Sequence, residues 1–206
     1  MHDFTTTLCS LPERLRGLRQ RMRRDDGLAL VEFAILAPFL GLMVMGVLEA
    51  GTAWRDALSV QDSVRAGART AANAGDHTHS DFETVRAIEI AMANDTNVAI
   101  QRVVIYNADA SPDVPAACQA GASVAGLCNV YDFPHGMVDT DFNAVSVCTT
   151  SPARQWCPTT RDNDLVGGLG RVGVHVQAER DWVTNLIPSP AMIIERSIVM
   201  QFDPET

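Results

Sequence analysis

The sequence predicts an α+β protein in which one long N-terminal helix precedes a small exported domain. Three observations lead to this prediction. An unbroken apolar run stands near the N-terminus, a helical pattern continues beyond it, and segments of the second half alternate apolar and polar residues with the period of a strand. The domain is expected to contain a helix, about three antiparallel strands and a loop region tied by disulfides.

Four segments follow from these patterns over the 206 residues. They are a cytoplasmic, arginine-rich leader (1–27), a transmembrane helix (28–50), an amphipathic helix extension (51–75) and an exported acidic α+β domain (76–206). A chain of this length suits one modest domain with appendages.

The apolar run extends from Leu28 to Leu48, 21 residues in which Glu32 is the only ionisable group. As a helix it would be about 31 Å long, which matches the hydrocarbon core of a bilayer. The h-region of a signal peptide is shorter, roughly 7–15 residues. The small residues 51–53 imitate a signal-peptidase site, so a cleaved signal stays open as the alternative. A membrane span is the preferred interpretation.

The charges predict the orientation of this span. All 16 basic residues are arginine, and six of them precede the apolar run. Because arginine-rich flanks stay on the cytoplasmic side, the N-terminus is expected in the cytoplasm and the domain outside the inner membrane. Beyond Gly51, ten arginines stand against 19 acidic residues. Such an acidic balance argues against nucleic acid as a partner.

Two helices are expected beyond the span. The first continues from the membrane to about Ala74, where Asn73 and Gly75 supply a stop signal. Its stripe, apolar except for Gln61, has spacings of three and four: Trp54, Leu58, Gln61, Val64, Ala68 and Ala71. The second helix begins with Ser80-x-x-Glu83, read as a capping box. Its apolar face consists of Phe82, Val85, Ile88 and Met92.

Three strands follow from the remaining patterns. They are the run "VAIQRVVIY" at 98–106, the alternation of 172–178, which predicts a half-buried strand, and the period of two in 192–202. Residues 108–170 are rich in Pro, Gly, Ser, Thr and Asp, so this region is expected to consist mainly of loops.

The cysteines agree with export. Four lie beyond the membrane span: Cys118, Cys128, Cys148 and Cys157. In an oxidising compartment they would form two disulfides, for which three connectivities exist. The pairs nearest in sequence, Cys118–Cys128 and Cys148–Cys157, are the simplest choice.

We expect no enzyme, no cofactor and no metal site. The motifs G-x-S-x-G, P-loop and C-x-x-C-H do not occur in the sequence. His77 and His79 would suit a metal, but a polar loop before a helix explains them more simply. The opening of a calcium loop at Asp139-x-Asp141-x-Asn143 fails at its sixth position, which is Ala144 instead of glycine.

The junction of leader and span looks like a prepilin-type processing site. Gly27 is followed by Leu28, and Glu32 occupies the fifth position after the glycine, before Phe33. More specifically, the segment from Gly27 to Ala72 resembles the TadE-like family of pseudopilins, or minor pilins, of tight-adherence (Flp-type) pilus systems. Further residues carry this resemblance: Pro38, Gly46, Glu49, Gly51 and the run "RAGAR" at 65–69.

The resemblance implies a set of partners and roles. A prepilin peptidase would cut after Gly27, and helix packing would involve Pro38, Gly46, Glu49 and Gly51. The partners would be membrane lipid, the peptidase, other pilins or pseudopilins and the pilus assembly platform. The protein would reside in the inner membrane or in an extracellular pilus. Pro38 is also expected to kink the helix, since it removes one backbone hydrogen bond.

Two departures narrow the subfamily. Major Flp pilins are very short and usually carry tyrosine after the glutamate, whereas this chain has Phe33 and continues for many residues. TadG-like relatives carry an inserted von Willebrand A-type domain with a D-x-S-x-S motif, which is absent here. The rival interpretation is a single-pass anchor whose exported domain binds a soluble ligand or a wall polymer, with no filament.

Overall fold

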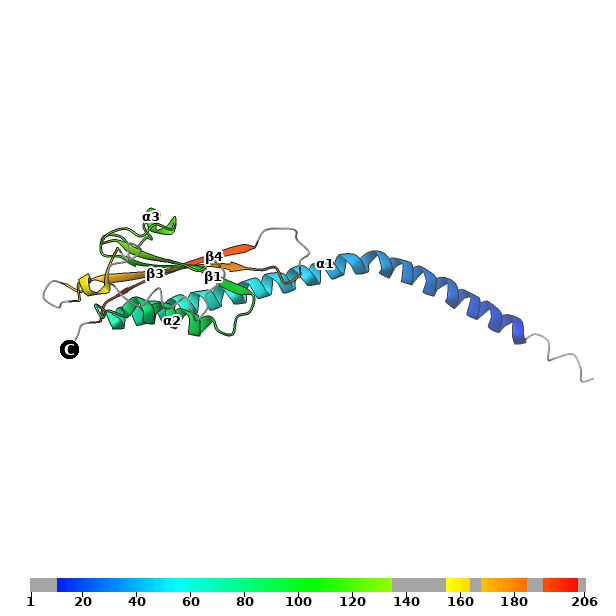
Figure 1. Cartoon of the computed structure of the whole chain (residues 1–206). Coiled ribbons are helices and arrows are strands. Elements are labelled where there is room, and N and C mark those ends of the chain that lie inside the picture. Colours follow the sequence, from blue (N-terminus) through cyan, green and yellow to red (C-terminus); the bar gives the residue numbers. More distant parts are fainter. Residues whose placement is uncertain (1–10, 135–154, 164–167, 185–190, 204–206) are drawn as a thin grey trace, which may run out of the picture. The chain divides into compact units, whose positions relative to one another are not determined.

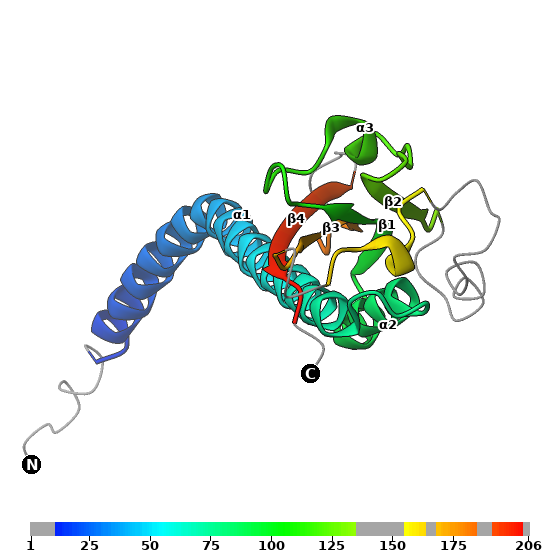
Figure 2. The same cartoon turned by 90° about the vertical axis from the view of Figure 1, so that its left-hand side faces the viewer.

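The computed structural model describes residues 11–134, 155–163, 168–184 and 191–203, with the backbone alone for 11–26. Two helices and four strands form its frame: α1 (Leu11–Ala74), α2 (Ser80–Met92), β1 (Val98–Asn107), β2 (Cys128–Asp132), β3 (Arg171–Arg180) and β4 (Met192–Gln201). The strands make one antiparallel sheet in the order β2-β1-β3-β4 (Figures 1 and 2). This confirms the predicted α+β class.

The chain divides into two compact units, 1–48 and 49–206. The first unit contains the apolar half of α1, whose large side chains between Leu28 and Leu48 are exposed. Among the described residues, α1 is the one helix long and apolar enough to cross a membrane. The finer division into leader, span, extension and exported domain stays a prediction.

Helix α1 begins at Leu11, so the expectation that the helix starts only after the leader is wrong. The leader is rich in good helix formers, and Pro12 lies in the first turn, where its missing N–H needs no partner. The helix ends at Ala74 as predicted. Gly75 follows with φ +48°, and its N–H donates to the carbonyl of Ala71 at 3.2 Å. The kink at Pro38 stays a prediction.

The second half of α1 buries a face different from the predicted stripe. Val64, Ala68 and Ala71 are buried as expected, but Trp54 is 72 % exposed and Leu58 is also exposed. The buried face instead includes Asp56, Val60, Ser63, Val64, Gly67, Ala68, Ala71 and Ala72. The stripe prediction rested on apolar residues, whereas the turns at the start of the second half of α1 contact the sheet through the polar side chains of Glu49, Thr52 and Asp56.

Helix α2 packs against α1 at a glycine. A Cβ atom added to Gly67 would lie 2.6 Å from the Ile88 side chain, so the missing side chain lets the helices approach. The predicted capping box is wrong, because Ser80 lies inside the helix and the N-cap is His79 without a side-chain cap. The Ser80 hydroxyl instead accepts a hydrogen bond from Arg161 at 3.3 Å.

The sheet has two covered faces (Figure 2). Helices α1 and α2 cover the inner face, whose core includes the alternating valines of β3. The loop carrying the short helix α3 (Ala116–Gln119) covers part of the outer face, beside a second apolar cluster. Outward-facing Gly173 and His175 are therefore buried as well, so β3 is covered on both faces over part of its length. The Tyr106 ring lies directly over Gly173.

Strand β2 lies in the region expected to consist mainly of loops. Only five residues long, it pairs with β1 next to the Cys118–Cys128 disulfide. Residues 108–170 also contain a short 3₁₀ helix, η2 (Pro158–Thr160). The calcium-loop candidate 139–144 lies outside the described residues.

The close approach at Gly67 yields a stability prediction. Gly67→Ala should destabilise the domain by about 1–3 kcal/mol, because the added methyl group overpacks the contact with Ile88. Gly51→Ala is the matched control: nothing lies within 4 Å of a Cβ there, and alanine favours a helix. Urea unfolding of the full chain in detergent micelles should separate the two variants. Equal or increased stability of Gly67→Ala would contradict this packing.

Candidate functional site

The second half of α1 is attached to the sheet by the side chain of Arg180, the last residue of β3. This guanidinium group is fully buried. Its Nε donates to Asp56 at 2.6 Å, one Nη to Glu49 at 2.9 Å and the other to the Thr52 hydroxyl at 2.7 Å. We call these four residues the Arg180 cluster. Glu49, Thr52 and Asp56 share one helix face, since their spacings are three and four.

Glu49 also binds the chain that follows β3. Its two carboxylate oxygens accept hydrogen bonds from the backbone N–H groups of Val183, at 3.2 Å, and Thr184, at 3.0 Å. The guanidinium of Arg180 lies 5.9 Å from the centre of the Trp182 ring. The first residue of the domain unit is thereby tied to both the end of β3 and the segment after it.

The electrostatics of the Arg180 cluster favour the charged form of Arg180. Burial alone would lower the pKa of Arg180, but the hydrogen bonds and charges of Asp56 and Glu49 outweigh burial and raise it. A buried ion pair contributes little net stability when intact, because desolvation offsets the attraction. Removing one partner is costly, since it leaves the other charge buried and unpaired. The cluster therefore fixes one docking geometry of helix and sheet.

A second buried network joins α2 to β2 and to the segment 155–163. The Asp81 carboxylate pairs with Arg161 and accepts hydrogen bonds from Asn129 at 2.8 Å and Tyr131 at 2.7 Å. The guanidinium of Arg161 lies 4.3 Å from the centre of the Trp156 ring. The Asn129 side chain also bonds the backbone of Gln155 and Trp156. This network holds the segment 155–163, which contains the short helix η2, against the sheet.

The disulfide between Cys118 and Cys128 is present, as the sequence-local pairing predicts. It joins α3 to the first residue of β2 and closes the loop that covers the outer face of the sheet. Cys157 is also disulfide-bonded. Its predicted partner, Cys148, lies outside the described residues.

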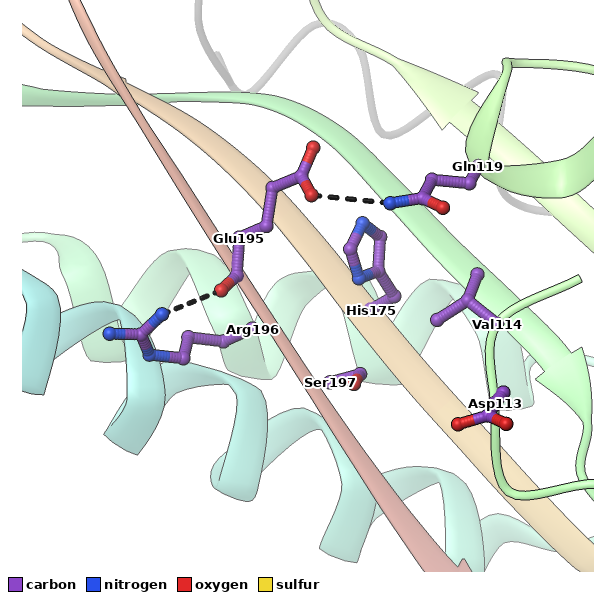
Figure 3. A pocket seen from close by; sticks show the side chains of 7 residues that line it. All are labelled: Asp113, Val114, Gln119, His175, Glu195, Arg196 and Ser197. Atoms are coloured by element: carbon purple, nitrogen blue, oxygen red, sulfur yellow. Dashed lines mark hydrogen bonds between the residues drawn. The ribbon is translucent and has the colours of Figure 1, made fainter. Parts of the chain in front are cut away.

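A cavity of about 360 Å³ opens on the outer face beside this loop. Its lining consists of Asp113, Val114, Gln119, His175, Glu195, Arg196 and Ser197 (Figure 3). Figure 3 shows the His175 ring pointing toward the hydrogen bond between Gln119 and Glu195, which is 3.2 Å long. His175 is 4 % exposed. Its burial lowers its pKa; the nearby Glu195 charge opposes this effect and the Arg102 charge adds to it.

The predicted site residues fall into two groups. Gly27, Leu28, Glu32, Phe33, Pro38, Gly46 and Gly51 are exposed along α1. Apart from neighbouring residues and the adjacent backbone of the helix itself, nothing described lies within 4 Å of a Cβ built on Gly27, Gly46 or Gly51. Glu49 alone among the predicted helix residues lies in a buried cluster. His77 and His79 have ring centres 5.6 Å apart. Within the described part of the chain, no group of three or more His, Cys, Asp or Glu side chains gathers at metal-binding distance.

The remaining members of the Arg180 cluster were not among the predicted site residues. A signal existed, because residues 49, 52 and 56 form a polar stripe at helical spacing directly after the apolar run. Its partner, Arg180, stands at the end of an apolar alternating strand. Sequence patterns of a single element do not show which strand end meets which helix turn.

A known family matches the segment from the apolar run to the second half of α1. Residues 27–69 match the model of the TadE-like protein family. The match confirms the resemblance predicted from Gly27, Glu32 and the residues around them. No curated protein and no solved structure matches the chain. The TadE-like segment includes Glu49, Thr52 and Asp56, and also Gly67 at the contact with α2.

The Arg180 cluster yields a prediction about how the TadE-like segment docks. Arg180→Met should lower the free energy of unfolding by about 3 kcal/mol or more, because Glu49 and Asp56 lose their buried cation. Arg196→Met is the matched control at an exposed position and should change stability by about 0.5 kcal/mol or less. Urea unfolding of the full chain in micelles measures both. Similar values for the two variants would exclude an anchoring role for Arg180.

His175 should make stability pH-dependent. Its folded pKa lies below the ordinary value of 6.5, so above that pH both states are neutral and His175 contributes no slope. As the pH falls below about 6.5, the unfolded chain binds a proton that the folded chain resists, and stability decreases. His175→Gln should lose this part of the slope, whereas His77→Gln, at an exposed position, should keep it. Urea unfolding at several pH values between 7.5 and 5 gives the free energy of unfolding as a function of pH. If this dependence has the same slope in His175→Gln and in wild type, His175 is not its source.

Proposed function

We propose that the chain is a non-enzymatic TadE-like minor pilin, or pseudopilin, that takes part in assembling a tight-adherence (Flp-type) pilus. The observation that supports this most is the family match over residues 27–69. It includes the processing glycine, the carboxylate at the fifth following position and the whole apolar run. The proposal includes no catalytic step, since the sequence carries no motif for one.

The exposed half of α1 supports an assembly role. Large apolar side chains on every side of the helix between Leu28 and Leu48 are exposed within the chain itself. A helix that is apolar all round needs a surrounding of lipid or other apolar helices. In a pilus, the same surface would exchange lipid contacts for contacts with neighbouring pilin helices. Gly41 and Gly46 lie about 140° apart around the helix, and each would allow close approach, because no other described part of the chain lies within 4 Å of a Cβ built there.

Glu32 has a physical role in this proposal. A carboxylate within an apolar span costs at least a few kcal/mol unless it has a partner. A cut after Gly27 would create an α-amino group at Leu28, which is cationic near neutral pH. Glu32 lies about one helical turn from that amine, and an amine of a neighbouring subunit is a second possible partner. Its place near the positive end of the shortened helix would add to the stabilisation.

The second half of α1, which packs on the sheet, could transmit a force from the membrane helix to the domain. The Arg180 cluster ties Glu49, Thr52 and Asp56 to the sheet. A pull that extracts the processed helix from the inner membrane would therefore act on the domain directly through this cluster. The arginine-rich leader would stay in the cytoplasm, where the prepilin peptidase cuts, and the domain would face outward. The partners would be the peptidase, other pilins or pseudopilins and the assembly platform.

The alternative function is a membrane-anchored domain that binds a soluble ligand or a wall polymer. One observation favours it: the cavity on the outer face, into which the buried His175 points. A ligand-binding anchor needs neither processing after Gly27 nor a partner for Glu32. The position of the gene also separates the two, because pilin genes stand beside genes for a secretion ATPase and a prepilin peptidase.

Processing is the first test. Co-expressed with the prepilin peptidase of its own cell, the chain should lose residues 1–27 and begin at Leu28. Gly27→Ala should slow or stop the cut without unfolding the protein, because no atom lies within 4 Å of the added Cβ. N-terminal sequencing and intact mass give the readout, and Gly46→Ala is the control that leaves the site unchanged. An intact N-terminus beside an active peptidase would support the anchor instead.

The second test concerns Glu32. Glu32→Leu removes a carboxylate from the apolar run, so membrane insertion should survive while assembly fails, because the new amine at Leu28 loses its partner. Glu32→Asp should give an intermediate result, since the charge remains but its reach is shorter. Cross-linking to partner pilins, normalised to membrane abundance, measures assembly. Equal cross-linking of Glu32→Leu and wild type would remove the assembly role of the carboxylate.

A further inference from the structure

The exposed apolar side chains of the domain unit are unevenly distributed. Beyond Leu48, the large apolar side chains exposed in the described residues are Trp54, Leu58, Ile90, Val183, Met192 and Ile193. Four of them lie at one end of the domain, the end where β3 finishes and β4 begins. We call Trp54, Val183, Met192 and Ile193 the apolar belt.

Contacts of the Arg180 cluster place the apolar belt beside the turns of α1 that contain Glu49, Thr52 and Asp56. Trp54 stands between Thr52 and Asp56 in the sequence. The N–H of Val183 bonds Glu49, and Met192 pairs with Arg180 in the sheet register. Ile193 is the next residue of β4. All four side chains therefore lie near the helix turns that follow the apolar run.

The four side chains of the apolar belt point in different directions around this end of the domain and do not form one patch. Trp54 precedes Asp56 by two residues, which turns its side chain about 160° away from the helix face that binds Arg180. Val183, Met192 and Ile193 lie on the sheet side of the helix. Met192 and Ile193 are neighbours in a strand, so they point to opposite faces of the sheet. A single helix of another protein would contact one side of such a belt and leave the others exposed.

The distance along α1 fits the interfacial layer of a bilayer. Trp54 follows Leu48 by six residues, or about 9 Å of helix. The layer between hydrocarbon and water is about 5–8 Å thick on each side of the membrane. Helical side chains lean toward the N-terminus, so the indole of Trp54 lies closer to the apolar run than its own Cα does. Tryptophan is enriched in this layer because its ring is amphipathic.

We propose that the apolar belt inserts into the headgroup layer of the outer leaflet and seats the domain end on a lipid surface. This inference rests on the proposed membrane span, and it adds a second, peripheral contact with the same bilayer. Burial of the Trp54 ring would remove an exposed aromatic surface from water. The exposed charges at this height, Arg55 and Asp181, are compatible with the hydrated headgroup layer, and the arginine suits lipid phosphates.

Depth-dependent fluorescence quenching tests the proposal. The full chain is reconstituted into vesicles of phosphatidylcholine and phosphatidylglycerol, with part of the phosphatidylcholine brominated near the headgroup end of the acyl chains. Trp156 and Trp182 contribute background, so the Trp54 signal is the difference between wild type and Trp54→Phe. The proposal predicts that brominated lipid removes most of this difference signal and that aqueous iodide leaves it nearly unchanged. Since Trp54 is exposed within the chain, Trp54→Phe should fold normally.

A second variant separates this inference from the proposed span. Phe39→Trp adds an indole in the middle of the apolar run, where Phe39 is exposed, so this variant is measured with phosphatidylcholine brominated near the methyl end of the acyl chains. If brominated lipid quenches this added indole but not Trp54, and iodide quenches Trp54, the belt inference fails while the span stands. Quenching of neither by lipid would overturn both. Protection of Trp54 from iodide only after partner pilins are added would assign the belt to a protein partner and overturn the lipid assignment.

Discussion

The guanidinium group of Arg180 carries a full charge inside the domain, and α1 supplies the groups that make this position tolerable. Glu49 and Asp56 balance the charge, Thr52 accepts the remaining donor, and burial excludes competing water. These contacts also fix the rotation of the second half of α1 about its own axis relative to the sheet. Val60, Val64 and the alanines that follow then face the sheet, and Gly67 meets α2. Polar residues therefore determine which face of the helix packs against the sheet, and small apolar residues form most of that contact.

This constraint explains which parts of the fold were predictable. Patterns internal to one element were sufficient for the end of α1 at Gly75 and for strands β1, β3 and β4. They were insufficient where two elements decide together. Trp54 and Leu58 fit an apolar stripe, but Arg180 selects another face. Ser80 fits a capping box, but Arg161 takes its hydroxyl. Strand β2 is short and contains asparagine and aspartate, so its pairing with β1 and the adjacent disulfide, not its composition, make it a strand.

The candidate site was predictable to a similar extent. Gly27, the proposed processing glycine, and Glu32 stand in a local sequence pattern, and the family match covers them. Glu49 was recognised through the same resemblance, but its physical role needs Arg180, which lies 131 residues away in the chain. The buried His175 belongs to a strand expected to be half-buried. His175 lines a cavity because the loop that contains Val114 and Gln119 crosses the outer face beside it.

The two halves of α1 have different surroundings, and the TadE-like segment includes most of both. The first half presents apolar side chains that need lipid or other helices. The second half belongs to the folded domain through the Arg180 cluster. Both halves belong to one helix, which extends from Leu11 to Ala74. In the proposed assembly role, a pull on the first half would act on the domain through the second half.

Hydrogen exchange followed by mass spectrometry tests most directly whether the second half of α1 belongs to the folded domain. In the full chain reconstituted into nanodiscs, peptides from 49–74 of α1 and from 171–180 of β3 should be protected together and lose protection together as urea is added. Such common opening is expected if the docked helix and the sheet form one cooperative unit. Rapid exchange of 49–60 while β3 stays protected would show that this half of the helix is not part of the domain, and would contradict the account.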